Sequence, residues 1–310
     1  MRSTSIVACA AACVVTIGGC RGGEHNVQSA QAGTPPKNPT RRIDNVGFSS
    51  PETVLWDSIA DVYLISNING KPGAADNNGF IARLRPDGSV EALKWIAGGQ
   101  DGVTLHGPKG MVLSADTLFV ADVDGVRLFD RKSGKSLGTR PIATKGLNDL
   151  AIGSDGTVYA TDLEPPPDGS DPSAPPAAIY RVTRTGGTPI VRGNQLQQPD
   201  GLLADRDGFI VAPFGAQDLY HIDRSGHKKV LATLPGAKLD GLYVLPNGWA
   251  VTSWDKQTVY LVQADGQFLP LVEHVESPAQ LGLDRKRMLL LIPSFNANAI
   301  VVEPLNEGTN

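Results

Sequence analysis

The sequence contains no cysteine after Cys20, so the rest of the chain has no thiol for a disulfide framework or a thiolate metal site. It has no basic excess either, because 28 Lys and Arg stand against 32 Asp and Glu and give a net charge of −4. That balance argues against a nucleic-acid binder, which needs a cationic surface. The 35 Gly and 23 Pro disfavour a protein of long helices, while 41% hydrophobic residues suffice for a core.

The first twenty residues predict an export signal. Arg2 precedes the uncharged apolar run Ile6–Ile17, which is too short to span about 30 Å of hydrocarbon. The end of the segment, Ile17-Gly18-Gly19-Cys20, resembles the bacterial lipobox. The resemblance implies cleavage before Cys20 and lipidation of its thiol; an ordinary signal with an incidental cysteine is the alternative.

Residues 20–41 are rich in Gly, Gln, Ser and Pro and have almost no apolar side chains, so they predict a flexible tether. We therefore expect a signal peptide over 1–19, a tether over 20–41 and a folded domain over 42–310. We expect the protein at the cell envelope, attached to the membrane only through the lipid anchor. Arg21 lacks the acidic character of an inner-membrane retention signal, which indicates the outer membrane of a Gram-negative cell.

A repeat of about forty residues organises the chain from residue 42. Asp-Gly occurs nine times and Asn-Gly three times between short apolar runs, and both dipeptides are strong hairpin signals. Each unit opens with Pro or Leu followed, in five of the six units, by a polar residue. These openers are Pro51-Glu52, Pro108-Lys109-Gly110, Leu147-Asn148-Asp149, Pro199-Asp200-Gly201, Leu239-Asp240-Gly241 and Pro278-Ala279-Gln280.

Six such units predict an all-β protein, a six-bladed β-propeller with four strands in each blade. The sixth unit ends near Pro304 without room for its outer strand. We expect the N-terminal segment Arg42–Phe48 to supply that strand and close the ring, which removes an exposed edge. An open sandwich is the structural alternative.

Two long spacings between openers indicate insertions. Asn69–Asn78 lengthens the loop between the second and third strands of the first unit, and Lys94–His106 leads into the second. Glu164–Ala178 lengthens the corresponding loop of the third unit. Strands of a blade alternate in direction, so these second-to-third loops and all six openers should share one mouth of the channel.

The openers converge in such a ring because the first strand of each blade lines the channel. In order, the ring is Glu52, Lys109, Asn148, Asp200, Asp240 and Ala279. Three carboxylates in a partly dry channel repel one another, so either a cation lies between them or some are protonated. Carboxylate and amide oxygens suit a hard divalent cation. With Lys109 the ring carries a formal charge of −2, which one divalent ion matches.

These motifs resemble those of the senescence-marker-protein/gluconolactonase/luciferin-regenerating-enzyme-like family of six-bladed propellers, over roughly residues 42–304. The family's Glu-and-Trp motif matches Glu52 and Trp56, and its Asn-Asp-Gly motif matches Asn148-Asp149 with Leu150 in place of Gly. Its last two ligand motifs match Asp200, where the family has Asn, and Asp240.

The resemblance implies a divalent metal held by Glu52, Asp200 and Asp240 with Asn148 close by, and hydrolysis of a lactone or ester. Ca²⁺ is the expected ion, with Zn²⁺, Mg²⁺ or Mn²⁺ as alternatives. Asp240 would take a proton from water, and Lys109 or Asn148 would stabilise or orient substrate oxygens. Asn67, at the end of a second strand, is a further substrate-binding candidate.

Lys109 leaves a second interpretation open. It has no place in the family's metal motif, and its ammonium group would neutralise the ring without a metal in a non-catalytic binding propeller. A lyase or synthase of the strictosidine-synthase-like kind ranks third, because such propellers lack this carboxylate set. We expect a small-molecule substrate, no nucleic acid and a monomer. The sequence has no Gly-x-Ser-x-Gly nucleophile motif and no His-Glu-x-x-His zinc motif.

Overall fold

The computed structural model describes residues 39–163 and 175–305. In these ranges the chain forms 24 strands, and its one helix is the short 3₁₀ turn Asn194–Leu196. No helix in the described ranges has the length and apolar character that crossing a membrane requires. The predicted signal peptide, Cys20 and most of the predicted tether lie outside the described residues, as does most of the Glu164–Ala178 insertion.

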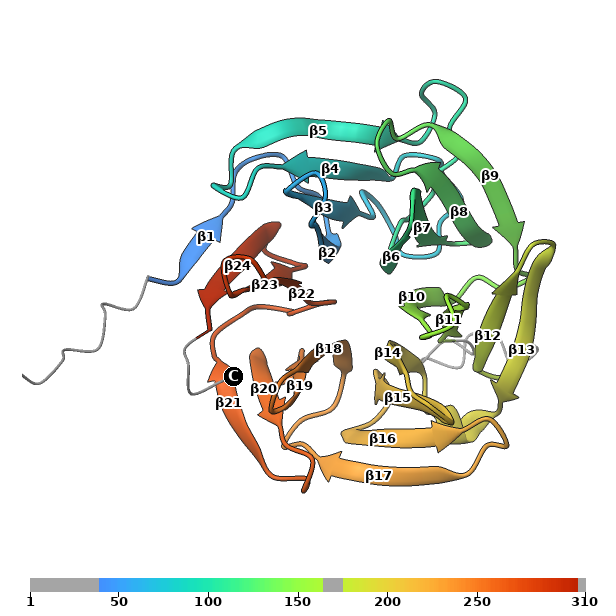
Figure 1. The fold of residues 1–310 in the computed structure, drawn as a ribbon, viewed down its shortest axis with the longest axis vertical. Coiled ribbons are helices and arrows are strands. Elements are labelled where there is room, and N and C mark those ends of the chain that lie inside the picture. Colours follow the sequence, from blue (N-terminus) through green and yellow to red (C-terminus); the bar gives the residue numbers. More distant parts are fainter. Residues whose placement is uncertain (1–38, 164–174, 306–310) are drawn as a thin grey trace, which may run out of the picture. The chain divides into compact units, whose positions relative to one another are not determined.

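The strands form six antiparallel sheets of four strands, arranged as blades around a central channel (Figure 1). Blades 1 to 3 consist of β2 (Pro51–Asp57), β3 (Val62–Asn67), β4 (Phe80–Leu84) and β5 (Val90–Ala97); β6 (Met111–Ser114), β7 (Thr117–Asp122), β8 (Gly125–Asp130) and β9 (Ser136–Pro141); and β10 (Leu147–Ile152), β11 (Val158–Asp162), β12 (Ala178–Thr183) and β13 (Gly186–Arg192). Blades 4 to 6 consist of β14 (Pro199–Ala204), β15 (Gly208–Pro213), β16 (Asp218–Asp223) and β17 (Lys228–Thr233); β18 (Leu239–Leu245), β19 (Gly248–Ser253), β20 (Thr258–Val262) and β21 (Phe268–Val272); and β22 (Gly282–Asp284), β23 (Leu289–Ser294), β24 (Ala299–Pro304) and β1 (Arg41–Ile43). The predicted six-bladed propeller is confirmed.

The N-terminal strand closes the ring. β1 pairs antiparallel with β24, with Ile43 opposite Ile300, and becomes the outer strand of blade 6. Closure therefore uses a shorter segment than the predicted Arg42–Phe48, although Phe48 is buried in the same core cluster as Ile43. The first and last described strands therefore lie side by side in one blade.

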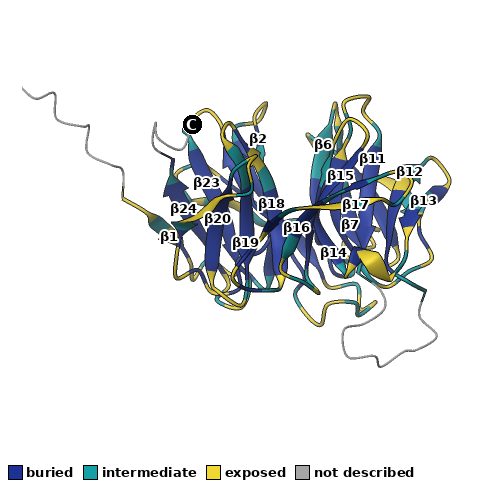
Figure 2. Cartoon of the chain, turned by 90° about the horizontal axis from the view of Figure 1, so that it is seen from below, coloured by how far each residue is buried: buried dark blue, intermediate teal, exposed yellow. Residues whose placement is uncertain are grey.

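Six clusters of buried apolar side chains fill the six interfaces between neighbouring blades. The first, for example, joins Tyr63 and Phe80 of blade 1 to Leu291 and Ile300 of blade 6. Polar contacts link blades as well: the Tyr63 hydroxyl donates to Asp284, and Arg131 of blade 2 donates to Asp57 of blade 1. Buried residues accordingly dominate the inner strands, and exposed residues gather at turns and outer strands (Figure 2).

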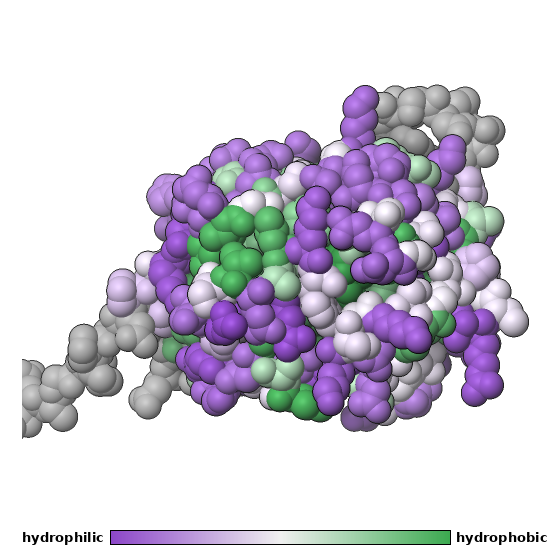
Figure 3. Space-filling model, turned by 90° about the horizontal axis from the view of Figure 1, so that it is seen from above, coloured by the Kyte–Doolittle hydropathy of each residue, from purple (hydrophilic) through white to green (hydrophobic). Residues whose placement is uncertain are grey.

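One face of the outer surface is largely hydrophilic (Figure 3). Seen from the β5 side, it presents polar side chains with hydrophobic patches between them (Figure 3).

Lys94–Ala97 belong to the outer strand β5, so the stretch Lys94–His106, predicted to lead into the second blade, is only partly a connection between blades. The strand continues because Ala97 and Ile96 still pair with Phe80 and Ile81.

Glycine follows the opener where two inner strands approach closely. A Cβ on Gly201 would lie 2.2 Å from the carbonyl oxygen of Asp240, and one on Gly241 would lie 2.3 Å from that of Ala279. No side chain fits at such distances, so these glycines allow the neighbouring inner strands to lie this close together.

Replacing Gly201 by Ala is therefore expected to lower the free energy of unfolding by about 1–3 kcal/mol, because the backbone of blade 5 must move away. Gly107→Ala is the control, since its Cβ would lie 3.4 Å from the nearest side-chain atom and its φ is not positive. Urea titration of both variants measures the difference. Equal midpoints would show that the inner strands yield freely at this point.

Candidate functional site

Each of four inner strands carries a polar residue on a β-bulge. The register between the first and second strands shifts across Glu52, across Asn148 and Asp149, across Asp200 and across Asp240. A bulge re-aims a side chain and leaves backbone groups outside the ladder. Four of the five polar openers predicted from the repeat are thus turned toward the channel by one recurring irregularity.

Hydroxyl groups on the second strands satisfy amides freed by the bulges. Ser66 Oγ accepts the N–H of Thr53 at 2.9 Å, Thr161 Oγ1 that of Asp149 at 2.9 Å, and Thr252 Oγ1 that of Gly241 at 2.6 Å. The same atom of Thr161 donates to the carbonyl oxygen of Asp200. Buried backbone amides need such partners, so these side chains hold the bulges in shape.

Three of these side chains bring their carboxyl groups close together. Glu52, Asp200 and Asp240 are 4%, 3% and 4% exposed, and one oxygen of each lies within 4.8 Å of those of the other two. Asn148 Nδ2 donates to Asp200 Oδ1 at 2.6 Å, and Thr53 Oγ1 donates to Glu52 Oε2 at 2.7 Å. The cluster joins blades 1, 3, 4 and 5 across the channel.

Two oxygens in this cluster are buried with no hydrogen-bond partner among the described residues, Asn148 Oδ1 and Asp240 Oδ1. Trp254 Nε1 also has no partner within hydrogen-bond geometry in the described ranges, but it faces Asp240, and a hydrogen bond from this indole N–H opposes the rise in the pKa of Asp240. Buried polar atoms without partners are rare in folded proteins and often mark the place of a ligand or an ion.

Burial raises the pKa of all three carboxyl groups. The pKa of Glu52 rises from 4.5 to about 7, chiefly through desolvation, which the Thr53 hydrogen bond and the Lys109 charge oppose. The pKa values of Asp200 and Asp240 also rise well above 3.8, first through desolvation and then through repulsion by the other carboxylates. A cation between them would lower all three values, because it favours the charged forms.

Lys109 lies in the same pocket but forms no ion pair within 4.0 Å of any described carboxylate. Its Nζ donates to the carbonyl oxygen of Leu147 at 2.6 Å, and the side chain is 5% exposed. Desolvation lowers the pKa of the amine, while the charges of Glu52 and Asp200 oppose that change. The ammonium group therefore stands beside the three carboxylates and does not fill the space between them.

Asp149 and Gln280 bind backbone N–H groups of the inner strands next to the ring, a role that was not predicted. Asp149 accepts the N–H groups of Leu150 at 2.7 Å and Leu202 at 2.9 Å, and Gln280 Nε2 donates to it at 3.0 Å. Gln280 Oε1 accepts the N–H of Leu242. Burial raises the pKa of Asp149 well above 3.8. Both residues adjoin an opener residue, so position in the repeat is the signal that would have found them.

Asn67 lies outside the pocket lining. Its Oδ1 accepts the N–H of Ser49 at 2.9 Å, and its Nδ2 donates to the carbonyl oxygen of Ile65 at 3.0 Å. The side chain is fully buried, so its polar atoms stabilise the loop before blade 1. The expectation that Asn67 contacts substrate therefore has no support in the geometry, and Asn67 has no place in the function proposed below.

The cluster forms the floor of a cavity of about 260 Å³. Its floor is polar, with Glu52, Lys109, Asn148, Asp200 and Asp240. The other lining residues are mainly apolar. They are Ile68, Pro72, Leu163, Gln198, Phe214, Trp254 and Phe295. Pro72 comes from the Asn69–Asn78 insertion, which therefore reaches the same mouth as the openers, as its position in the repeat predicts.

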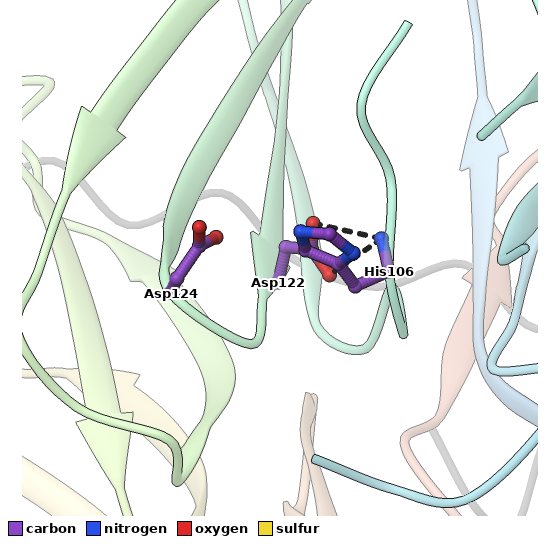
Figure 4. Close-up of side chains that lie close together, drawn as sticks. All are labelled: His106, Asp122 and Asp124. Carbon is purple, nitrogen blue, oxygen red and sulfur yellow. Dashed lines mark hydrogen bonds between the residues drawn. The ribbon is translucent and has the colours of Figure 1, made fainter. Parts of the chain in front are cut away.

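Two other groups of acidic residues and histidines lie elsewhere on the described chain. In the first, Asp122 accepts the backbone N–H of His106 (Figure 4) and that of Gly107, and Arg127 bridges Asp122 and Asp124. The guanidinium group already supplies the positive charge. In the second, His221 Nε2 lies 3.2 Å from Asp207, near the opposite end of β14 from Asp200, and both Asp205 and Asp207 are exposed. Neither group resembles the buried floor of the cavity.

No protein-family model matches the sequence, and no curated protein has a significantly similar one. Solved structures do match. They include a gluconolactonase from Xanthomonas campestris (TM-score 0.64, 18% identity, 87% of this chain and 99% of that chain) and the calcium-binding regucalcin from Agrobacterium tumefaciens (0.62, 15%, 86% and 97%). A virginiamycin B lyase from Staphylococcus aureus also matches (0.56, 13%, 86% and 100%). At these identities the likeness shows the six-bladed propeller fold.

Proposed function

We propose that this protein is a divalent-metal-dependent hydrolase of a lactone or ester, with its site in the cavity at the channel mouth. The observation that carries the proposal is the meeting of Glu52, Asp200 and Asp240 beside the unpartnered oxygen of Asn148. Calcium lies about 2.3–2.6 Å from its oxygen ligands, so two ligands on opposite sides are roughly 5 Å apart. Oxygens within 4.8 Å of one another fit around such an ion.

A bound divalent cation would polarise the substrate carbonyl and acidify a water molecule. Asp240 accepts the proton of the attacking water, and the burial of its Oδ1 without a hydrogen-bond partner among the described residues supports this role. The water oxygen bonds to the acyl carbon, the carbon–oxygen bond of the lactone or ester breaks, and the proton passes from Asp240 to the leaving oxygen. Lys109 stabilises negative charge on the carbonyl oxygen, and Asn148 orients substrate.

Metal analysis with a lactone screen tests the proposal. Full-length protein is expected to contain about one divalent ion per chain and to hydrolyse at least one lactone or ester. Chelation should remove the activity, and adding back Ca²⁺ (or Zn²⁺, Mg²⁺ or Mn²⁺) should restore it. Chelation-resistant turnover, or no stoichiometric metal, would refute the metal-dependent mechanism.

A non-catalytic binding propeller is the second candidate, and Lys109 is the observation that favours it. Its buried ammonium group offsets one carboxylate charge without any metal. In that case the purified protein would contain no stoichiometric metal and would hydrolyse nothing. Metal content therefore separates the two candidates.

Lyase chemistry receives less support from the cavity. The virginiamycin B lyase that shares the fold is catalytically inactive when one histidine is replaced by alanine. No histidine is among the described residues that line this cavity. Hydrolysis therefore remains the chemistry that the carboxylate floor supports best.

We also propose that the chain is exported and held at the cell envelope by a lipid on Cys20. The support is the sequence pattern Ile17-Gly18-Gly19-Cys20 after an uncharged apolar run. Labelling of cells with a radioactive fatty acid tests this, since Cys20→Ser should abolish incorporation.

A further inference from the structure

The wall of the cavity is built from one position of the repeat. The residue that directly follows the second strand is apolar in every blade, namely Ile68, Val123, Leu163, Phe214, Trp254 and Phe295. All but Val123 line the cavity. A ring of apolar side chains thus stands beside the polar ring of the openers.

Backbone hydrogen bonds hold this apolar ring in place. In five blades the N–H of the wall residue donates to the carbonyl oxygen of the residue just before the opener, for example Phe214 to Gln198 at 2.8 Å and Trp254 to Lys238 at 3.1 Å. The residues before four openers, including Gln198 and Lys238, have a positive φ. Wall and floor are therefore tied together by the same backbone geometry and form one prearranged cavity.

Three consecutive blades contribute aromatic rings to the wall. Phe214 contacts Trp254 with ring centroids 5.4 Å apart, and Trp254 contacts Phe295 at the same distance. Each of the three is partly exposed, so the rings present an open apolar surface next to Asp240. We call these three residues the aromatic arc.

Resting on the proposed hydrolase function, we infer that the substrate is a lactone or ester bearing an aryl or short alkyl group, which packs on the aromatic arc. A polyhydroxylated sugar lactone fits poorly, because each buried hydroxyl needs a hydrogen-bond partner and the faces of the three rings offer none. The volume of about 260 Å³ admits one small ring with one such group.

Binding of lactams tests the inference independently of turnover, because a lactam resists hydrolysis. With metal-loaded full-length protein, 5-phenylpyrrolidin-2-one should bind at least about tenfold more tightly than pyrrolidin-2-one by calorimetry. The corresponding lactones, γ-phenyl-γ-butyrolactone and γ-butyrolactone, should show the same order in kcat/KM, with glucono-δ-lactone the poorest substrate.

Phe295→Ala should remove most of the phenyl preference, whereas Phe268→Ala should preserve it, because Phe268 is an exposed aromatic residue on the outer strand β21. Equal affinity for the two lactams, tighter binding of gluconolactam, or an unchanged preference in Phe295→Ala would overturn the inference. Phenyl-selective lactam binding without hydrolysis of any lactone would uphold the inference and refute the proposed hydrolase.

Discussion

Replacing Asp240 by Asn is expected to lower kcat for lactone hydrolysis by about 10²–10⁴-fold, the usual contribution of a positioned general base. The asparagine side chain would keep an oxygen that can bind a hard cation, while the change removes the negative charge and the ability to take a proton. The side chain is buried beside two other carboxyl groups, so removing its charge relieves repulsion and should not unfold the protein. Stopped-flow or pH-stat kinetics on a lactone measure the loss.

The matched control is Asp265→Asn. Asp265 belongs to an exposed Asp-Gly turn, where its Oδ1 accepts the N–H of Gln267, and Asn can accept the same bond. Both variants should retain the wild-type circular dichroism spectrum and bind metal. Wild-type turnover in Asp240→Asn would remove this residue from the mechanism, and loss of metal in that variant would assign it to binding instead.

The repeat makes the ring of openers predictable from the sequence. Opener spacing places Glu52, Lys109, Asn148, Asp200 and Asp240 at the start of inner strands, and the structure gathers these five around one cavity. Periodicity carries this information because equivalent positions of a propeller meet at its axis.

Three features escape prediction because they depend on local geometry that a motif does not encode. The bulges that aim the openers arise from register shifts, and their hydroxyl partners, such as Thr161, lie on another strand. Asn67 occupies a promising repeat position, yet its amide is engaged with the backbone. Phe214 was not predicted, because its contact with Trp254 depends on how blades 4 and 5 pack together.

Metal removal should make stability fall as pH rises. The pKa of Glu52 is about 7 in the folded protein against an ordinary value of 4.5, so the folded state binds more protons between these values. Stability is therefore lost as pH increases from 4.5 to 7, and this difference in pKa corresponds to about 3 kcal/mol. Asp200 and Asp240 act in the same direction, while Lys109, whose pKa is lowered, acts oppositely below 10.5.

A divalent ion should reverse this trend, because it binds the ionised carboxylates that the metal-free fold resists. At a thousand times its Kd, a ligand adds about 4 kcal/mol, which is roughly 8–16 °C in Tm for a domain of this size. We expect thermal melts in EDTA to show a lower Tm at pH 8 than at pH 5, and Ca²⁺ to raise Tm more at pH 8.

Asp200→Asn should raise the metal-free Tm at pH 8 and weaken the response to Ca²⁺, since it removes one charge and keeps an amide oxygen. If the Tm changes with neither pH nor Ca²⁺, the charge of Lys109 already neutralises the carboxylates without a metal. The non-catalytic binding propeller would then be the better description.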